Sequence, residues 1–232
     1  MSGENDRTVP LADIQAYADE ARDEEVRVLV TGFGTTTLDH LDDPTIRIIT
    51  HSPLKVSYAP LPDLIPQLIE THRPNLILHL GLDNVRKSYN LEQSSSRTSF
   101  PSSDVDGASW SIDRSLAVWP PGEIEERLVS TFDVEKIRGK CGKVEGVELR
   151  SSDAVGNYLC AFVYYTTLAW YETKEKGGER PVLFLHVPVC STGEHIIQGR
   201  DVTIEIIKSM VAVWLARKDK AGKRQRVGSR AS

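Results

Sequence analysis

The most informative stretch of the chain is SDAVGNYLCAFVYYTTL, residues 152–168. It follows a strand-like run at 147–150, and its apolar residues then recur at helical spacing. The pattern predicts a strand followed by a helix, with Ser152 and Asp153 suited to the helix start and Cys160 near its front. Peptide N–H groups and the helix dipole favour negative charge there, so we expect a thiol that loses its proton easily. Cysteines in half-buried helices more often serve packing alone.

The remaining pattern predicts a parallel-rich sheet with helices between its strands. Leu76–Gly81 is almost continuously apolar, which is typical of a central parallel strand covered on both faces. Within it, His79 is expected to be a hydrogen-bonded core residue rather than a ligand. With 232 residues and 40% hydrophobic content, one α/β domain with a full core is expected. The other predicted elements are strands at 26–31, 46–50, 54–58 and 181–188, a short ordered piece at 89–92, helices at 61–72, 123–128 and 199–215, and a connector at 134–143.

Composition argues against several classes of protein. No apolar run approaches the ~18 residues that a membrane span needs, and the acidic N-terminus is unlike a secretory signal or transit peptide. The three cysteines, Cys141, Cys160 and Cys190, form no CxxC pair and are odd in number. They argue against a disulfide framework or a zinc site and favour a reduced, cytoplasmic setting.

Charge is distributed unevenly along the chain. The net charge is −5, but residues 217–232 carry seven basic side chains and one acid, so this tail is +6 and the rest is −11. We expect the tail to be disordered and solubilising, although its basic run could be a nuclear address or a polyanion contact. No aromatic residue lies among these charges, so no nucleic-acid partner is expected. The chain is therefore divided into an acidic extension (1–25), a domain (26–216) and a basic tail (217–232).

Chemically active side chains are expected at the carboxyl edge of the predicted sheet, where α/β proteins place their sites. A long polar segment that contains Glu92 follows Gly81, and His186 lies at the end of the last strand. A thiol, an imidazole and a carboxylate are the groups that nucleophilic acyl transfer requires. The imidazole takes the thiol proton and later protonates the leaving amine, while the carboxylate orients the imidazole. Cys160, His186 and Glu92 are therefore a candidate triad.

These segments resemble the pyroglutamyl peptidase I family, cysteine peptidases of α/β/α architecture that remove an N-terminal pyroglutamate. The resemblance covers about residues 26–215 and is most specific at GNYLCAFVYY, residues 156–165, which is similar to the family's Gly-x-Tyr-Leu-Cys-x-Phe-x-Tyr-Tyr segment. FLHVP at 184–188 is similar to its histidine strand. LHLG at 78–81, followed by NLE at 90–92, is similar to its strand and glutamate loop.

The resemblance implies a three-layer α/β/α sandwich with a mixed, mostly parallel central sheet. It implies Cys160 as the nucleophile, His186 as the acid/base and Glu92 as the orienting carboxylate, acting through a thioester acyl-enzyme without a metal or cofactor.

The expected partner is a peptide with an N-terminal pyroglutamate, and no membrane partner is expected. By similarity, the lactam of the substrate would lie against Phe33, with Leu82 and Tyr158 nearby. Backbone N–H groups around the nucleophile would meet the oxyanion. The resemblance leaves the oligomeric state open.

The first loop departs from the family pattern. The family has Gly-Phe-x-Pro-Phe there, whereas this chain has Gly32-Phe33-Gly34-Thr35-Thr36 and loses one aromatic ring. The loss would remove ~1–3 kcal/mol of lactam binding. The following segment is shortened, and Ala154-Val155 replaces the usual Asp-Ala.

These departures leave two further hypotheses open. The chain could be a catalytically impaired or non-enzymatic relative that binds ligands on the same scaffold. Cys160 alkylation no faster than that of a free thiol would favour this hypothesis. A nucleoside-phosphorylase-like enzyme would need a phosphate-binding arginine in the loop at 32–34, and that loop has none.

Overall fold

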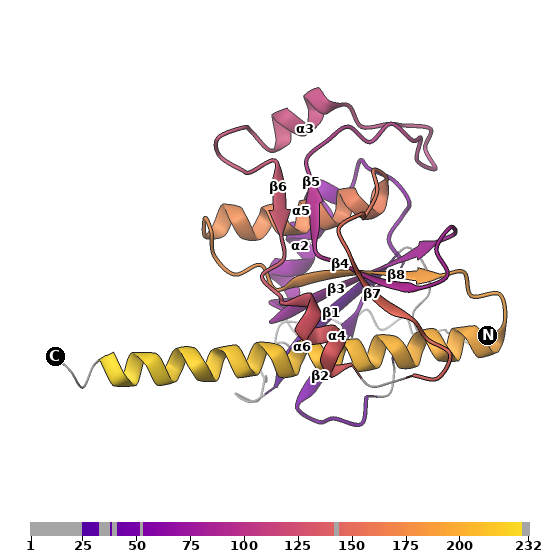
Figure 1. Ribbon diagram of the computed structural model, residues 1–232. Helices are drawn as coiled ribbons and strands as arrows, with labels where there is room; N and C mark the ends of the chain where they lie inside the picture. The colour runs from indigo at the N-terminus through magenta and orange to yellow at the C-terminus, as the bar shows by residue number, and fades with distance from the viewer. Residues whose placement is uncertain (1–24, 33–37, 39–40, 52, 142–143, 229–232) are drawn as a thin grey trace, which may run out of the picture.

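A six-stranded sheet forms the centre of the protein (Figure 1). The computed structural model describes residues 25–32, 38, 41–51, 53–141 and 144–228. The strands β2, β1, β3 and β8 are parallel, β4 is antiparallel to β8, and β7 is parallel to β4. The sheet is therefore mixed and mostly parallel, as expected. In sheet order the strands are β2 (Ile46–Thr50), β1 (Val26–Gly32), β3 (Leu76–Asp83), β8 (Val182–Pro188), β4 (Tyr89–Glu92) and β7 (Leu149–Ser152).

Helices cover both faces of this sheet, which confirms the three-layer α/β/α arrangement. One face carries α2 (Leu61–His72) and α5 (Leu159–Lys174), and the other carries α4 (Val134–Lys140) and α6 (Gly193–Gly228) (Figure 1). A smaller unit consists of a two-stranded antiparallel sheet, β5 (Ser94–Ser96) and β6 (Arg127–Val129), which lies beside α5, and of α3 (Ile112–Val118), which stands beyond them in Figure 1.

Strand alternation divides the core into two parts. Ile77 of β3 and Phe184 of β8 pack with α2 and α5, whereas Leu78 and Leu185 pack with α4 and α6. Because successive side chains of a strand point to opposite faces, every second residue of β3 and β8 faces α5. The sheet thus presents a predictable row of side chains to the helix that carries Cys160.

Three segments differ from the predicted pattern. Residues 54–58 form a loop instead of a strand, and the Tyr58 N–H donates to Oδ2 of Asp104 at 2.9 Å. Residues 123–128 contain a turn and the start of β6 instead of a helix. The connector at 134–143 contains α4, whose first turn is capped by Asp133 accepting the Lys136 N–H at 3.0 Å.

α6 is longer at both ends than its apolar periodicity predicts. It runs to Gly228, so most of the tail expected to be disordered is helical, and in Figure 1 this end extends beyond the sheet. Lysine, arginine and alanine propagate a helix well once a packed segment has started it. Arg217 also ties this part to the body by donating to the Thr131 carbonyl at 2.7 Å. The N-terminal extension at 1–24 lies outside the described residues. Among the described helices, none has the length and apolar character that crossing a bilayer requires.

His79 is a neutral core residue, as expected from the sequence. Its Nδ1 lies 2.7 Å from the Thr31 hydroxyl, and its Nε2 lies 2.8 Å from the Thr167 hydroxyl. The Thr167 hydroxyl donates its single proton to the Val163 carbonyl at 2.8 Å, so Nε2 of His79 donates and Nδ1 accepts from Thr31. Burial lowers the pKa of His79 from 6.5 to about 3. The ring therefore joins β1, β3 and α5 as an uncharged link.

We expect the His79 environment to make the protein less stable in mild acid. The unfolded chain takes up a proton on His79 below 6.5, whereas the folded protein resists it down to about 3. The stabilisation that comes from keeping His79 uncharged is therefore fully present above pH 6.5. As the pH falls from 6.5 towards 3, the free energy of unfolding decreases by up to about 1.4 kcal/mol per pH unit. Urea unfolding of wild type and His79→Gln at several pH values measures the difference. The variant should be less stable at neutral pH and should lack this component, and equal pH slopes would contradict the assignment.

Candidate active site

Sheet register brings the predicted imidazole and carboxylate to the face covered by α5. Gly81 of β3 lies opposite His186 of β8, and the next row contains Phe184, Glu92 of β4 and Ser152 of β7. Phe184 belongs to the part of the core under α5, so His186, two residues further along β8, faces the same helix. Antiparallel pairing of β4 thus places Glu92 beside Phe184, diagonal to His186 on the same face.

Glu92 and His186 form a buried hydrogen-bonded pair. Oε1 of Glu92 lies 2.8 Å from Nδ1 of His186, and the two residues are 0% and 5% exposed. Burial raises the pKa of Glu92, but hydrogen bonds from His186 and Ser152 and the charge of Arg86 outweigh it and leave the pKa below its usual value. Oε2 of Glu92 is buried without a hydrogen bond in normal geometry among the described residues. The Ser152 hydroxyl is still close enough to favour the charged form.

The Cys160 sulfur lies over Gly81, the glycine near the end of β3. A methyl group at Gly81 would lie 2.9 Å from Sγ of Cys160 and 2.6 Å from the Phe184 ring, so only glycine leaves room for the sulfur. Gly81 and His186 are register partners on neighbouring strands, which are about 4.8 Å apart in a sheet. The thiol therefore lies over the strand position next to the imidazole. The described polar contacts of the ring both involve Nδ1, which lies near Oε1 of Glu92 and a terminal nitrogen of Arg86.

The thiol is not acidified in the way that its position near a helix start predicts. Burial raises the pKa of Cys160 to about 12, and the negative charges of Asp83 and Glu92 add to the effect. The Cys160 N–H and the charge of Arg86 act in the opposite direction and are outweighed. The expectation of an easily lost proton is therefore corrected: the dipole is present, but desolvation of the sulfur is the larger influence.

α5 begins later than its sequence indicates. Its first residue is Leu159, with Tyr158 extended at the N-cap, whereas Ser152 still belongs to β7. Asp153 does not cap the helix, because it binds Arg127 at 2.8 Å and the Ser94 hydroxyl at 2.9 Å. Cys160 is thus in the first turn, where backbone N–H groups lack helical partners.

Two charged residues of the site had no role in the sequence prediction. Asp83 ends β3 on the α5 face, and it accepts the N–H groups of Val85 at 2.8 Å and Arg86 at 3.0 Å. The Arg86 guanidinium pairs with the Asp83 carboxylate and donates to Oε1 of Glu92 at 3.0 Å. Burial raises the pKa of Asp83, but these hydrogen bonds and the Arg86 charge outweigh it and lower the pKa to about 2. The short Asp-x-x-Arg spacing after a strand end was the available signal.

The three predicted substrate residues have different outcomes. Phe33 lies outside the described residues. Leu82 is 60% exposed, and strand alternation directs it to the face opposite Gly81. The Tyr158 hydroxyl donates to the Ser103 carbonyl at 3.1 Å, which joins the loop at 101–109 to the start of α5. Contact of all three with a substrate stays a prediction.

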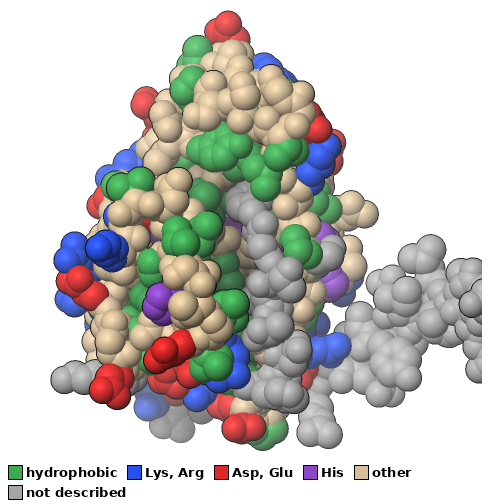
Figure 2. Space-filling model, turned by 90° about the vertical axis from the view of Figure 1, so that its right-hand side faces the viewer, with side chains coloured by type: hydrophobic (Ala, Val, Ile, Leu, Met, Phe, Trp, Pro, Cys, Tyr) green, Lys and Arg blue, Asp and Glu red, His purple; other side chains and the backbone are tan. Residues whose placement is uncertain are grey.

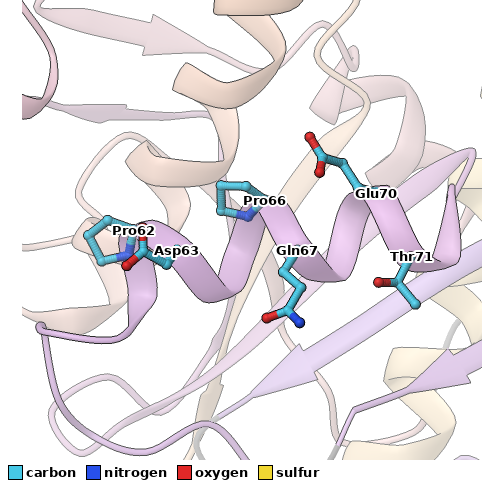
Figure 3. A pocket seen from close by; sticks show the side chains of 6 residues that line it. All are labelled: Pro62, Asp63, Pro66, Gln67, Glu70 and Thr71. Atoms are coloured by element: carbon cyan, nitrogen blue, oxygen red, sulfur yellow. The ribbon is translucent and has the colours of Figure 1, made fainter.

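The surface around the strand ends is mixed in character. Figure 2 views the molecule from the side at which β8 ends, and hydrophobic side chains gather in its middle while charged ones lie mainly at its edges. A separate pocket on the outer surface of α2 (Figure 3) has divergent side chains from that helix alone and no candidate catalytic group. It is lined by Pro62, Asp63, Pro66, Gln67, Glu70 and Thr71.

Comparison with known proteins finds similar peptidases. No family profile matches the chain. The human pyroglutamyl-peptidase 1-like protein is 29% identical over 147 residues, which cover 60% of this chain and 65% of that protein, just under two thirds of its length. Mouse pyroglutamyl-peptidase 1 is 26% identical over 168 residues, which cover 69% of this chain and 71% of that protein.

Solved structures share the fold. The pyrrolidone carboxyl peptidase of Pyrococcus furiosus aligns with a TM-score of 0.64 and 22% identity over 83% of this chain and 99% of its own. The Thermococcus litoralis enzyme aligns with a TM-score of 0.66 and 17% identity over 83% and 96%. In sequence the chain is thus similar to pyroglutamyl peptidases, and it shares its fold with the pyrrolidone carboxyl peptidases.

Proposed function

We propose that the protein is a cysteine exopeptidase that removes N-terminal pyroglutamate from peptides. The observation that carries the proposal is the buried Glu92–His186 pair, with the Cys160 sulfur over the adjacent strand position. The named peptidases among its relatives support the same reaction class. In this proposal Cys160 is the nucleophile, His186 the acid/base and Glu92 the orienting carboxylate.

The reaction follows from these roles. Sγ of Cys160 forms a bond to the pyroglutamyl carbonyl carbon while its proton passes to Nε2 of His186. The C–N bond then breaks, the proton moves to the leaving amine, and a thioester remains. Water adds to the thioester and gives a proton to Nε2. Cleavage of the C–S bond returns that proton to sulfur and releases free pyroglutamate.

The raised pKa of the thiol determines how this reaction begins. A thiol with a pKa of about 12 is uncharged at neutral pH, so the nucleophile rests as a thiol and not as a thiolate. The proton therefore leaves as the S–C bond forms, with His186 as general base. For the same reason, slow alkylation of Cys160 does not by itself indicate an inactive relative. Cleavage of a substrate is the more direct criterion.

Backbone groups at the start of α5 are suited to the developing oxyanion. The first helical hydrogen bond of α5 runs from the Phe162 N–H to the Tyr158 carbonyl at 3.0 Å. The N–H groups that precede it have no acceptor within the helix, and they lie beside the sulfur. We assign the oxyanion to these N–H groups and the uncharged lactam to the neighbourhood of Phe33 and Tyr158, because Leu82 points to the other face of the sheet. The three cysteines are all free, which supports a reduced, cytoplasmic setting.

An arylamide assay tests the proposed activity. The full chain should release the arylamine from a pyroglutamyl substrate and leave an alanyl substrate intact, because a free α-amino group adds charge and lacks the lactam. Prolonged treatment with iodoacetamide should abolish release in proportion to Cys160 alkylation, measured by mass spectrometry of its peptide. Release from neither substrate, or equal release from both, would overturn the proposal and favour a non-enzymatic relative.

A further inference from the structure

We propose that Arg86 is a positioning residue that holds the Glu92–His186 pair in one arrangement, with the imidazole proton on Nδ1 and the Nε2 lone pair free for the thiol. The inference rests on the proposed function, because it assigns Arg86 a part in readying the acid/base. It also concerns a property of the folded protein that can be measured without any substrate.

The contacts of Arg86 connect the ends of three strands. Its Nε pairs with the Asp83 carboxylate at the end of β3. One terminal nitrogen donates to the Ser152 hydroxyl of β7 at 3.1 Å, and the other donates to Oε1 of Glu92 on β4 at 3.0 Å. A planar guanidinium fixes these directions in a way that a lysine ammonium does not. The carboxylate of Glu92 therefore cannot rotate away from His186 without losing the arginine as well.

The same geometry selects one tautomer of His186. Nδ1 lies 2.8 Å from Oε1 of Glu92 and 3.2 Å from the Arg86 nitrogen. Without a proton on Nδ1, its lone pair would face that of the carboxylate oxygen at hydrogen-bonding distance. With the proton there, Oε1 accepts from both His186 and Arg86, and the arginine has no need of Nδ1. The ring proton therefore lies toward Glu92, and Nε2 is the basic nitrogen.

The charge of Arg86 also opposes a second proton on the ring. The charged and titratable groups around His186 are Glu92 from β4, Asp83 from β3, Arg86 from the connection between them and Cys160 from α5. Arg86 is the permanent cation of this set, and it shares Oε1 of Glu92 with the imidazole. Without it, two carboxylates would remain to stabilise a positively charged ring, with no cation beside them to oppose it.

Substrate binding is a poorer explanation of Arg86. Its three nitrogens already donate to Asp83, Ser152 and Glu92, and the second terminal nitrogen also lies 3.5 Å from the Ala154 carbonyl. The side chain is 30% exposed, which leaves little of it available to a ligand. A pyroglutamyl group carries no negative charge that a guanidinium would pair with.

NMR titration of the His186 ring in the full-length protein tests the inference, with the signal assigned by loss in His186→Gln. In Arg86→Met the titration midpoint should rise by about one pH unit or more relative to wild type. Arg86→Lys keeps the charge and should restore most of the difference. Arg86→Gln should show the same midpoint as Arg86→Met, and it replaces that variant in the test if Arg86→Met fails to fold.

A second arginine provides the matched control. Arg127 also forms an ion pair, with Asp153 at 2.8 Å, but it touches neither Glu92 nor His186, so Arg127→Met should leave the midpoint unchanged. An unchanged midpoint in Arg86→Met and Arg86→Gln would overturn the inference, as would an equal rise in Arg127→Met. A protein without peptidase activity would still give the titration, so the two proposals can fail separately. In an active protein, the acid limb of kcat/KM should move upward with the midpoint.

Discussion

Replacing Cys160 by alanine should lower kcat/KM for a pyroglutamyl arylamide by about 10⁴-fold or more, to the rate without enzyme. Cys160→Ala removes only the sulfur, and no described hydrogen bond of its side chain holds other elements together. The Glu92–His186 pair would remain, but an imidazole without its nucleophile has no acyl-enzyme to form. The unfolding midpoint should stay close to that of wild type, so the loss would be chemical rather than structural. Initial rates and thermal unfolding of the same preparation measure both quantities.

Cys190→Ala is the matched control for this substitution. Cys190 is also free and partly exposed, but its sulfur lies 3.5 Å from the Pro188 and His195 carbonyl oxygens, outside the candidate site. It should keep nearly full activity and should remain sensitive to iodoacetamide. Full activity in Cys160→Ala would remove the residue from the mechanism whatever its geometry. Equal losses in both variants would indicate a general disturbance instead of a missing nucleophile.

The sequence predicted the site best where side chains follow from strands. Apolar runs locate β3 and β8, and the carboxyl ends of two parallel strands lie at the same edge of a sheet. The proximity of His186 and Gly81 could therefore be predicted from the sequence alone. Glu92 is different. Its approach to His186 depends on β4 running antiparallel to β8, which a four-residue strand in a long polar segment does not reveal.

Electrostatics was predicted less well than position. A cysteine in the first turn of a helix suggests a lowered pKa, yet the pKa of Cys160 is raised because the sulfur is buried and two carboxylates lie near it. Neither influence is local in sequence: burial comes from β3 and the Phe184 ring, and Glu92 comes from β4. Arg86 was missed for a similar reason, because its partners on β4 and β7 become its neighbours only when these strands pair in the folded sheet. Periodicity reports which face of an element is apolar, and it carries no information on charges that meet across strands.

Among substitutions that keep all three candidate catalytic side chains, Gly81→Ala should cause the largest loss of activity and stability. The new methyl group would lie 2.6 Å from the Phe184 ring and 2.9 Å from the Cys160 sulfur, and contacts this short require movement. Phe184 is fully buried, and its ring centroid is 4.7 Å from that of His186, so it cannot move without displacing the imidazole. Overpacking of this kind costs about 1–3 kcal/mol of unfolding free energy. A shift of the nucleophile by about 1 Å costs about 10²-fold in rate.

A glycine with open space separates these effects from a general consequence of adding a methyl group. Gly139 lies in α4, and a methyl group built there meets nothing within 4 Å, so Gly139→Ala should keep full activity and gain about 0.5–1 kcal/mol from helix propensity. Urea unfolding and arylamide kinetics of both variants measure the contrast. If Gly81→Ala were as active and as stable as wild type, the sulfur could not lie against β3. The proposed approach of the thiol to His186 would then lose its geometric basis, because Gly81 is the strand position through which the two are neighbours.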